Sequence, residues 1–211
     1  MNKENLLRIQ TYFNELFPDA RGELEYSKDY ELLISVILSA QATDVSVNAA
    51  MRPFYKTHPT LESIGALSIL ELENNFKTIG LYKTKAANVF KTVKILLQTY
   101  EGKVPSDKDQ LLLLPGVGIK TANVVRAELF KIPEIAVDTH VNRISKRLDF
   151  AKPADSVETV EGKLRKILAR EDYIKTHHQM IFFGRYFCKA KNPRCRECHL
   201  VDICKEKNKN L

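Results

Sequence analysis

Residues 114–122 read LPGVGIKTA, and this stretch decides the fold. It lies between a short apolar turn and a predicted helix that runs from Ile119 to about Phe130. Pro115 marks the end of the preceding helix, because a proline disfavours the helical conformation of the residue before it. Gly116 and Gly118 permit a positive-φ turn and a close approach of the backbone to a ligand. The first N–H groups of the new helix then lack acceptors and face outward, an arrangement that binds phosphate.

The complete string matches the helix-hairpin-helix motif, with which DNA-binding proteins grip a backbone phosphate without reading the base sequence. A Gly-x-Gly pair alone indicates only a tight connection between two helices. The charge of the chain agrees with the longer match: the net charge is +7 and the isoelectric point is about 9.1. A basic protein favours an anionic partner such as nucleic acid. The motif and the charge together predict binding to duplex DNA.

The composition is that of a soluble globular protein. The chain has 211 residues, of which 44% are hydrophobic and 28% are charged, and this excludes a disordered or collagen-like chain. Its length allows one or two domains. No apolar run approaches the roughly 18 residues that a membrane-spanning helix needs. The first residues mix charges with apolar side chains, so we expect a cytosolic protein without a secretory signal.

Helical periodicity runs through most of the chain. Between residues 82 and 102 the apolar side chains recur at steps of three and four, and Gly102 supplies a stop. There is no sustained period-two alternation and no Asn-Gly or Asp-Gly hairpin turn. Predicted helix starts are Thr60, Ser106, Ser156 and a capping box of Ser68 with Glu71. We therefore predict an all-α chain of about ten short helices.

Lys120 breaks the usual charge pattern of helices. The positive end of the helix dipole favours carboxylates in the first turn, so a lysine there is unfavourable by a few tenths to ~1 kcal/mol. The same field increases the share of neutral amine, the form that acts as a nucleophile. The alternative is a lysine that pairs with a phosphate or is simply solvated.

Asp138 is the candidate partner of Lys120. It follows the partly extended residues 131–137 and is a natural N-cap for a helix that begins with the next residue. The helix from Ile119 to Phe130 is ~18 Å long, and seven extended residues span at most ~25 Å. The connection can therefore return Asp138 to the level of Lys120, so that an amine and a carboxylate face each other across a groove. A simple helix cap is the alternative.

The four cysteines, Cys188, Cys195, Cys198 and Cys204, have the spacing C-x6-C-x2-C-x5-C. Disulfides are rare in the cytosol, so the spacing indicates a tetrathiolate metal site. Zinc ribbons pair two C-x2-C knuckles, and the common ferredoxin patterns also differ, so the spacing does not choose the metal. His199 lies within the same segment, but four thiolates already complete a ligand set.

Basic residues concentrate around these cysteines. Residues 185–211 hold eight basic and three acidic residues, a net charge of +5. Between the first two cysteines lie Lys189, Lys191 and Arg194. A metal that ties the two ends together makes this stretch a rigid basic loop, which lowers the ordering cost of binding DNA phosphates.

These motifs resemble those of one family, the endonuclease III DNA glycosylases of base excision repair. The matching stretches are LSAQATDVSVN (38–48), IGLYKTKA (79–86), LPGVGIKTANVV (114–125), AVDTHVNRI (136–144) and the cysteine pattern. The resemblance implies the all-α helix-hairpin-helix glycosylase fold of two helical domains with a DNA cleft between them. One is a six-helix barrel at 22–132, and the other combines 1–21 with 133–211. It also implies that the four cysteines hold one 4Fe-4S cluster.

The resemblance further implies a bifunctional glycosylase and AP lyase that removes oxidised pyrimidines. Lys120 resembles the nucleophile, which forms a Schiff base with the sugar before β-elimination breaks the strand. Asp138 resembles the carboxylate that deprotonates the lysine or stabilises charge on the sugar. The enzyme must extrude the damaged base. Gln41 resembles the residue that fills the vacated space, and Leu81 resembles the wedge on the opposite strand.

The implied partner is damaged double-stranded DNA, with no membrane and with a monomer as the working unit; the implied location is the bacterial cytoplasm, at the nucleoid. Three alternatives remain. The adenine-mismatch glycosylases lack a lysine at the position of Lys120 and have an extra C-terminal domain, whereas this chain ends seven residues after Cys204. A non-catalytic helix-hairpin-helix module would use Lys120 only to grip phosphate. The metal centre could instead be a redox or zinc regulatory element.

Overall fold

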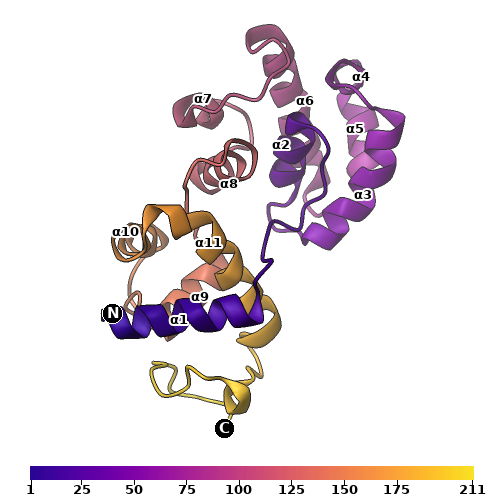
Figure 1. Ribbon diagram of the computed structural model, residues 1–211. Coiled ribbons are helices and arrows are strands. Elements are labelled where there is room, and N and C mark those ends of the chain that lie inside the picture. Colours follow the sequence, from indigo (N-terminus) through magenta and orange to yellow (C-terminus); the bar gives the residue numbers. More distant parts are fainter. The chain divides into compact units, whose positions relative to one another are not determined.

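The computed structural model describes all 211 residues, and every regular element in it is helical, as predicted (Figure 1). The chain divides into two compact units: a continuous unit of residues 23–132, and a discontinuous unit of residues 1–22 with 133–211. None of the helices is long and apolar enough to span a membrane.

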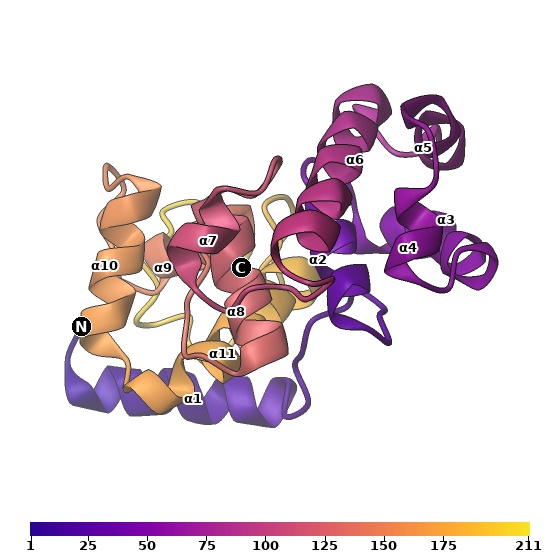
Figure 2. The same ribbon diagram turned by 90° about the horizontal axis from the view of Figure 1, so that it is seen from above.

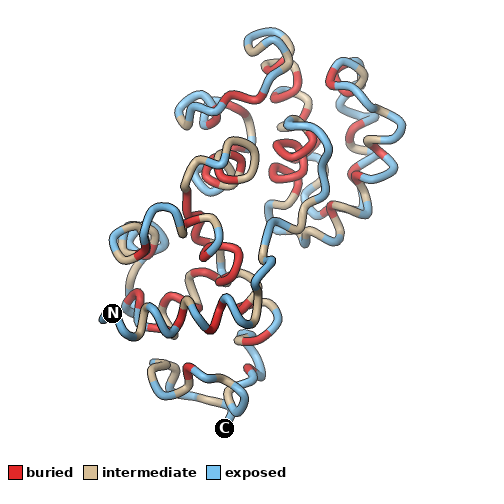
Figure 3. Tube along the Cα trace, in the orientation of Figure 1, coloured by how far each residue is buried: buried red, intermediate tan, exposed pale blue.

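The continuous unit is built around its first helix. Its helices are α2 (Asp29–Leu38), α3 (Asp44–Thr57), α4 (Leu61–Gly65), α5 (Ile69–Phe76), α6 (Tyr82–Thr99), α7 (Lys108–Leu112) and α8 (Ile119–Phe130). Every residue of α2 from Glu31 to Leu38 is buried (Figure 3). Helix α2 packs against α3, α6 and α8. Burial on all sides explains why its sequence is apolar without a polar stripe.

The discontinuous unit joins the two ends of the chain. Its helices are α1 (Lys3–Leu16), α9 (Thr139–Arg147), α10 (Val157–Ile167) and α11 (Tyr173–Phe182), the last followed by a π-helical turn, η2 (Phe183–Phe187). Two short 3₁₀ turns, η1 (Arg170–Asp172) and η3 (Cys195–Glu197), complete it. Helix α11 packs against α1 and α9 (Figure 2). Aromatic rings fill the core, with Phe13 and Phe183 5.0 Å apart between ring centroids.

Side chains cap the helices largely where the sequence predicts. Thr60, Ser68 and Ser156 each accept a hydrogen bond from a backbone N–H in the first turn, and Ser68 forms the capping box with Glu71. The prediction at Ser106 is wrong. Helix α7 begins one residue later, and Oδ1 of Asp107 accepts the bond from Gln110 N at 3.0 Å. The aspartate is favoured there because its negative charge faces the positive end of the helix dipole.

Helix α1 holds the cysteine segment, residues 188–204, in place. Arg8 donates to the Asp202 carboxylate at 2.6 Å and to the His199 carbonyl at 2.5 Å. The Tyr12 hydroxyl donates to the Glu197 carbonyl at 3.2 Å, and the Tyr12 ring stacks on His199. These contacts join the first helix to a segment almost 200 residues away in the sequence, as in the 194 residues that separate Arg8 from Asp202.

Candidate active site and metal centre

The glycine hairpin, residues 113–118, connects α7 to α8 and is held by the protein around it. Gly116 adopts φ +82°, which favours glycine. A Cβ at Gly116 would lie 2.9 Å from Nδ2 of Asn88 and 3.0 Å from Cγ2 of Ile37. The Thr92 hydroxyl donates to the carbonyl of Pro115 at 3.0 Å. Both the backbone conformation and the packing therefore require glycine at position 116.

Gly118 differs from Gly116, because nothing in the protein requires a glycine there. It is the N-cap of α8, its backbone is extended, and no side chain caps the helix. A Cβ at Gly118 would meet no atom within 4 Å. The position therefore leaves open space in front of the uncapped N–H groups of the first turn. An anion such as a phosphate can approach these groups closely.

Lys120 is the second residue of α8, directly beside this open space. Its side chain is exposed and makes no hydrogen bond or ion pair within the chain. The preceding residue, Ile119, is also exposed, at 56%. The amine therefore lies on the surface of the continuous unit at the positive end of a helix dipole.

Gln41 and Leu81 adopt the same unusual conformation on neighbouring turns. Both have left-handed backbones, with φ values of 54° and 60°, and both side chains are exposed, Leu81 by 60%. Such a conformation costs roughly 1–2 kcal/mol for a residue other than glycine. A Cβ at Gly80 would lie 4.0 Å from the carbonyl oxygen of Gln41, so the two turns are adjacent.

These turns belong to the same end of the continuous unit as the glycine hairpin. Gln41 follows α2, and Leu81 precedes α6. Ile37 near the end of α2 and Asn88 in the second turn of α6 both lie against Gly116. The sequence motifs that flank residues 41, 81 and 116 thus lie close together, although they are separated in the sequence.

Asp138 lies in the discontinuous unit, where it caps α9. Its Oδ1 accepts a hydrogen bond from the N–H of Val141 at 2.7 Å, as the sequence predicts for an N-cap. The residue is half-buried. Its second oxygen, Oδ2, makes no hydrogen bond within the chain, so one carboxylate oxygen holds the helix and the other is available for chemistry.

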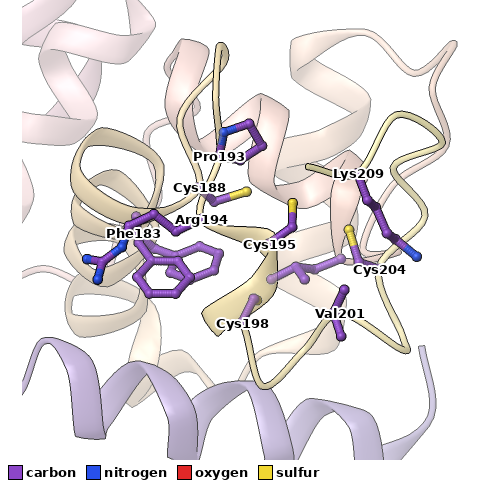
Figure 4. A pocket seen from close by; sticks show the side chains of 11 residues that line it. Phe183, Cys188, Pro193, Arg194, Cys195, Cys198, Val201, Cys204 and Lys209 are labelled. Carbon is purple, nitrogen blue, oxygen red and sulfur yellow. The ribbon is translucent and has the colours of Figure 1, made fainter. Parts of the chain in front are cut away.

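The four cysteines line a single pocket with apolar neighbours that include Phe183, Pro193 and Val201 (Figure 4). All four thiols are free and half-buried. Burial raises the pKa of Cys188, which the Arg147 guanidinium opposes, and burial raises the pKa of Cys198 to about 11. No three of the His, Cys, Asp and Glu side chains are grouped to hold one metal ion.

Four thiols are a ligand set that either a single zinc ion or an iron-sulfur cluster can take. One zinc ion binds each sulfur at about 2.3 Å, which brings the sulfurs to within about 4 Å of one another. Four thiols are the ligand set that a 4Fe-4S cluster takes. The residues present therefore fit a polynuclear iron-sulfur group.

The basic loop, residues 189–194, presents its charges unequally. Lys189 and Lys191 are exposed and form no ion pair within the chain. Arg194 pairs with Glu197, with Nε 3.1 Å from Oε1, and its guanidinium lies 5.1 Å from the centroid of the Phe187 ring. Arg194 therefore helps to shape the loop, whereas the two lysines are available to an external anion. His199 does not line the pocket; its ring stacks on Tyr12.

Two residues beside the cysteines have no motif in the sequence. Arg147 donates from Nη1 to the sulfur of Cys188 at 3.2 Å and from Nε to Glu206 at 2.8 Å. Fifty-nine residues separate Arg147 from Glu206 in the chain. The only sequence signal is an arginine pair, Arg143 and Arg147, spaced by four residues near the end of a helix, where cations are common.

The all-helical fold and the glycine hairpin define a class: helix-hairpin-helix proteins that grip DNA through its backbone. Residues 34–170 match the model of the HhH-GPD superfamily of base excision DNA repair proteins. The chain is 47% identical to endonuclease III of Escherichia coli (strain K12), covering 99% of both chains, and 47% identical to endonuclease III of Bacillus subtilis (strain 168), covering 92% of this chain and 89% of that one. A solved structure of a trapped covalent endonuclease III–DNA intermediate matches with a TM-score of 0.93 and 46% identity, covering 98% of this chain and 97% of that one.

The chain belongs to the endonuclease III family of this superfamily. It is thus a base excision repair enzyme of the DNA glycosylase and AP lyase type.

Proposed function

We propose that the protein removes oxidised pyrimidines from damaged double-stranded DNA, with Lys120 as the nucleophile. The amine attacks the anomeric carbon of the damaged nucleoside, the base leaves, and a Schiff base forms between the lysine and the opened sugar. β-Elimination then breaks the strand on the 3′ side of the sugar. The single observation that carries this proposal is the exposed, unpaired Lys120 in the first turn of α8, beside the open space at Gly118.

The site supports each part of this role. A phosphate held at the hairpin fixes the DNA strand near the amine, and the helix dipole disfavours the ammonium form that cannot attack. The trapped covalent complex of a protein 46% identical to this chain supports a covalent step. That relative is named for a DNA intermediate, so duplex DNA is the substrate class that we assign.

Asp138 is the second catalytic group in this proposal. Its cap bond to Val141 fixes the carboxylate, and the free Oδ2 either accepts a proton from the lysine or stabilises positive charge on the sugar. We further propose that the two units correspond to the two domains of the family, at 22–132 and at 1–21 with 133–211.

We propose that Gln41 and Leu81 enter the base stack of the DNA. Their exposed side chains stand on adjacent left-handed turns, next to the hairpin that holds the phosphate. We propose that Gln41 fills the space of the extruded nucleotide and that Leu81 enters the opposite strand.

The cysteines are the proposed ligands of one 4Fe-4S cluster. Bound there, the cluster supplies a cross-link that fixes the basic loop, so that Lys189 and Lys191 meet DNA phosphates without an ordering cost. Analysis of iron and sulfide in the purified protein, with its visible absorption, tests the metal. A colourless protein that contains zinc would refute the assignment.

We propose that a monomer acts alone, because the chain itself holds every group that the reaction needs. Sedimentation at micromolar concentration, with and without DNA, tests this. The relatives named above are bacterial, and we expect the protein to act on the nucleoid in the cytoplasm.

Borohydride trapping tests the nucleophile. Duplexes that contain thymine glycol or an abasic site are incubated with the protein and borohydride, and the covalent adduct is resolved by electrophoresis. We expect an adduct with the natural protein and with Lys108→Gln, which removes a charge from the neighbouring helix α7, but none with Lys120→Ala. An adduct that survives Lys120→Ala would place the nucleophile elsewhere. A panel of defined lesions then ranks the substrates.

A further inference from the structure

Arg147 connects the first cysteine of the metal centre, Cys188, with Glu206, which lies two residues after the last cysteine. It is the final residue of α9, and its side chain is only 12% exposed. From Nη1 it donates to the sulfur of Cys188 at 3.2 Å and to the carbonyl of Lys189 at 2.9 Å. Its Nε donates to the carboxylate of Glu206 at 2.8 Å. One guanidinium therefore holds the start of the cysteine segment and the residues beyond its end.

Glu206 completes this connection at the other end. Its backbone N–H points to the sulfur of Cys204 at 3.5 Å, within the range of a hydrogen bond to sulfur, and the N–H of Lys205 donates to the carbonyl of Arg147 at 2.7 Å. The Glu206 side chain is 26% exposed. Arg147 and Glu206 form a largely buried ion pair whose two members each approach a cysteine sulfur.

The donors to the sulfurs differ in charge. Cys188 accepts from a guanidinium, whereas Cys198 and Cys204 are approached by the neutral backbone N–H groups of Leu200 and Glu206. Charged hydrogen bonds are roughly twice as strong as neutral ones. Hydrogen bonds to cluster sulfurs, local net charge and solvent exposure set the reduction potential of iron-sulfur clusters.

We infer that Arg147 and Glu206 are positioning residues that set the reduction potential of the metal centre in opposite directions. Arg147 donates to Cys188 and places a positive charge beside it, which stabilises the more negative, reduced form. Glu206 holds Arg147 in place through their ion pair. Its negative charge partly cancels the positive charge of Arg147, and this cancellation lowers the reduction potential. This inference rests on the proposed 4Fe-4S cluster, and it concerns an equilibrium property rather than a step of the DNA reaction.

Three variants test the inference by voltammetry of the purified, cluster-loaded protein without DNA, at fixed pH and ionic strength. We expect Arg147→Met to lower the potential and Glu206→Gln to raise it, each by roughly a tenfold change in the reduction equilibrium, about 59 mV for one electron. Lys205→Met is the matched control. Its ammonium is exposed and only 3.8 Å from Asp149, so its removal changes the charge of the same segment without a contact to sulfur. Because solvent screens this exposed charge, we expect a much smaller change in potential for this variant than for the other two.

Shifts of opposite sign separate this role from a merely structural one, because a loosened segment would move both potentials in the same direction or leave them unchanged. If Arg147→Met loses iron, Glu206→Gln still decides the question. Equal potentials in Glu206→Gln and the natural protein would overturn the inference and leave the cluster intact. A natural protein without iron and sulfide would overturn the cluster proposal as well, so the two failures are distinguishable.

Discussion

The hydroxyl of Thr92 donates a hydrogen bond to the carbonyl oxygen of Pro115 at 3.0 Å and thereby fastens the glycine hairpin to helix α6. Thr92 is fully buried. The carbonyl precedes Gly116, the residue with the left-handed backbone, so this bond acts at the point where the chain reverses. The hairpin is thus positioned by α6, the helix that begins directly after Leu81.

Replacing Thr92 with valine tests this connection. The valine keeps the volume but leaves the carbonyl of Pro115 without its donor, and we expect the free energy of unfolding to fall by about 1–3 kcal/mol. Urea unfolding measures the change. Thr99→Val, at the exposed end of the same helix, is the control, and an equal loss there would mean that the hydrogen bond contributes nothing.

The two glycines of the hairpin should respond differently to alanine. Gly116→Ala introduces strain and a contact with Asn88, so it should destabilise the protein. Gly118→Ala should cost less stability than Gly116→Ala, because alanine is only a poorer N-cap than glycine, but it should weaken DNA binding at least tenfold, because its methyl group occupies the space before the helix N–H groups. Unfolding and DNA titration measure the two effects. Gly162→Ala, also in open space but in helix α10, should retain full affinity.

Asp138 combines a cap with a proposed catalytic role, and two substitutions separate these functions. Asparagine is as good an N-cap as aspartate, so Asp138→Asn should keep the stability but slow base removal roughly 10²-fold or more. Asp138→Ala should slow the reaction and also lose about 0.5–2 kcal/mol of stability. Single-turnover kinetics and unfolding measure both. Full activity of the Asp138→Asn protein would show that Asp138 serves only as a helix cap.

Lys85 carries a charge that the folded protein does not satisfy. Its side chain is 4% exposed, its ammonium has no hydrogen-bond partner, and burial lowers its pKa from the ordinary 10.5. Lys85→Met should therefore stabilise the protein by at least about 1 kcal/mol at neutral pH. The unfolded chain holds this proton more tightly than the folded one, so the natural protein gains stability as the pH rises toward 10.5.

The stability gap between Lys85→Met and the natural protein should accordingly narrow with increasing pH, measured by urea unfolding at several pH values. Lys91→Met, on the exposed face of the same helix, should change stability by less than about 0.5 kcal/mol. A gap that stays constant with pH would show that the ammonium is not the cause.

The basic loop should contribute to DNA affinity mainly through its two unpaired lysines. Changing Lys189 and Lys191 together to glutamine should weaken binding and reduce the slope of log affinity against log salt by about 2. Arg194→Gln should instead alter the conformation of the loop, because the Arg194 guanidinium pairs with Glu197 and lies over the ring of Phe187. Titrations at several salt concentrations distinguish these effects. An unchanged slope in the double variant would remove the lysines from the interface.

Local signals in the sequence predicted local structure well. A polar residue and the two or three residues after it are enough to predict a helix start, as at Thr60, Ser68, Asp138 and Ser156. The turn at Gly116 was predicted from equally few residues. The error at Ser106 has the same origin, since Ser106 and Asp107 are both good caps and only the packed structure chooses between them. Helix caps depend on hydrogen bonds between residues that are close in the sequence, so a few consecutive residues are enough to predict them.

Contacts between distant segments could not be predicted in this way. In the sequence, Arg147 is an ordinary basic residue at the end of a helix. Its contacts with Cys188 and Glu206, which are 41 and 59 residues away, are visible only in the folded structure. The strain at Gln41 and Leu81 is equally invisible, because neither residue type favours a left-handed backbone. The family resemblance singled out these two residues, whereas propensity did not.

The pairing of α1 with the far end of the chain has a consequence for biosynthesis. A ribosome delivers residues 23–132 as one uninterrupted block, which can collapse into its own core while translation continues. The first helix, by contrast, must wait for Asp202 and His199 before Arg8 finds its partners. The apolar side of α1 remains uncovered until α11 and Phe183 have been synthesised. Premature termination before that point would leave a folded continuous unit and an exposed apolar helix at the start of the chain.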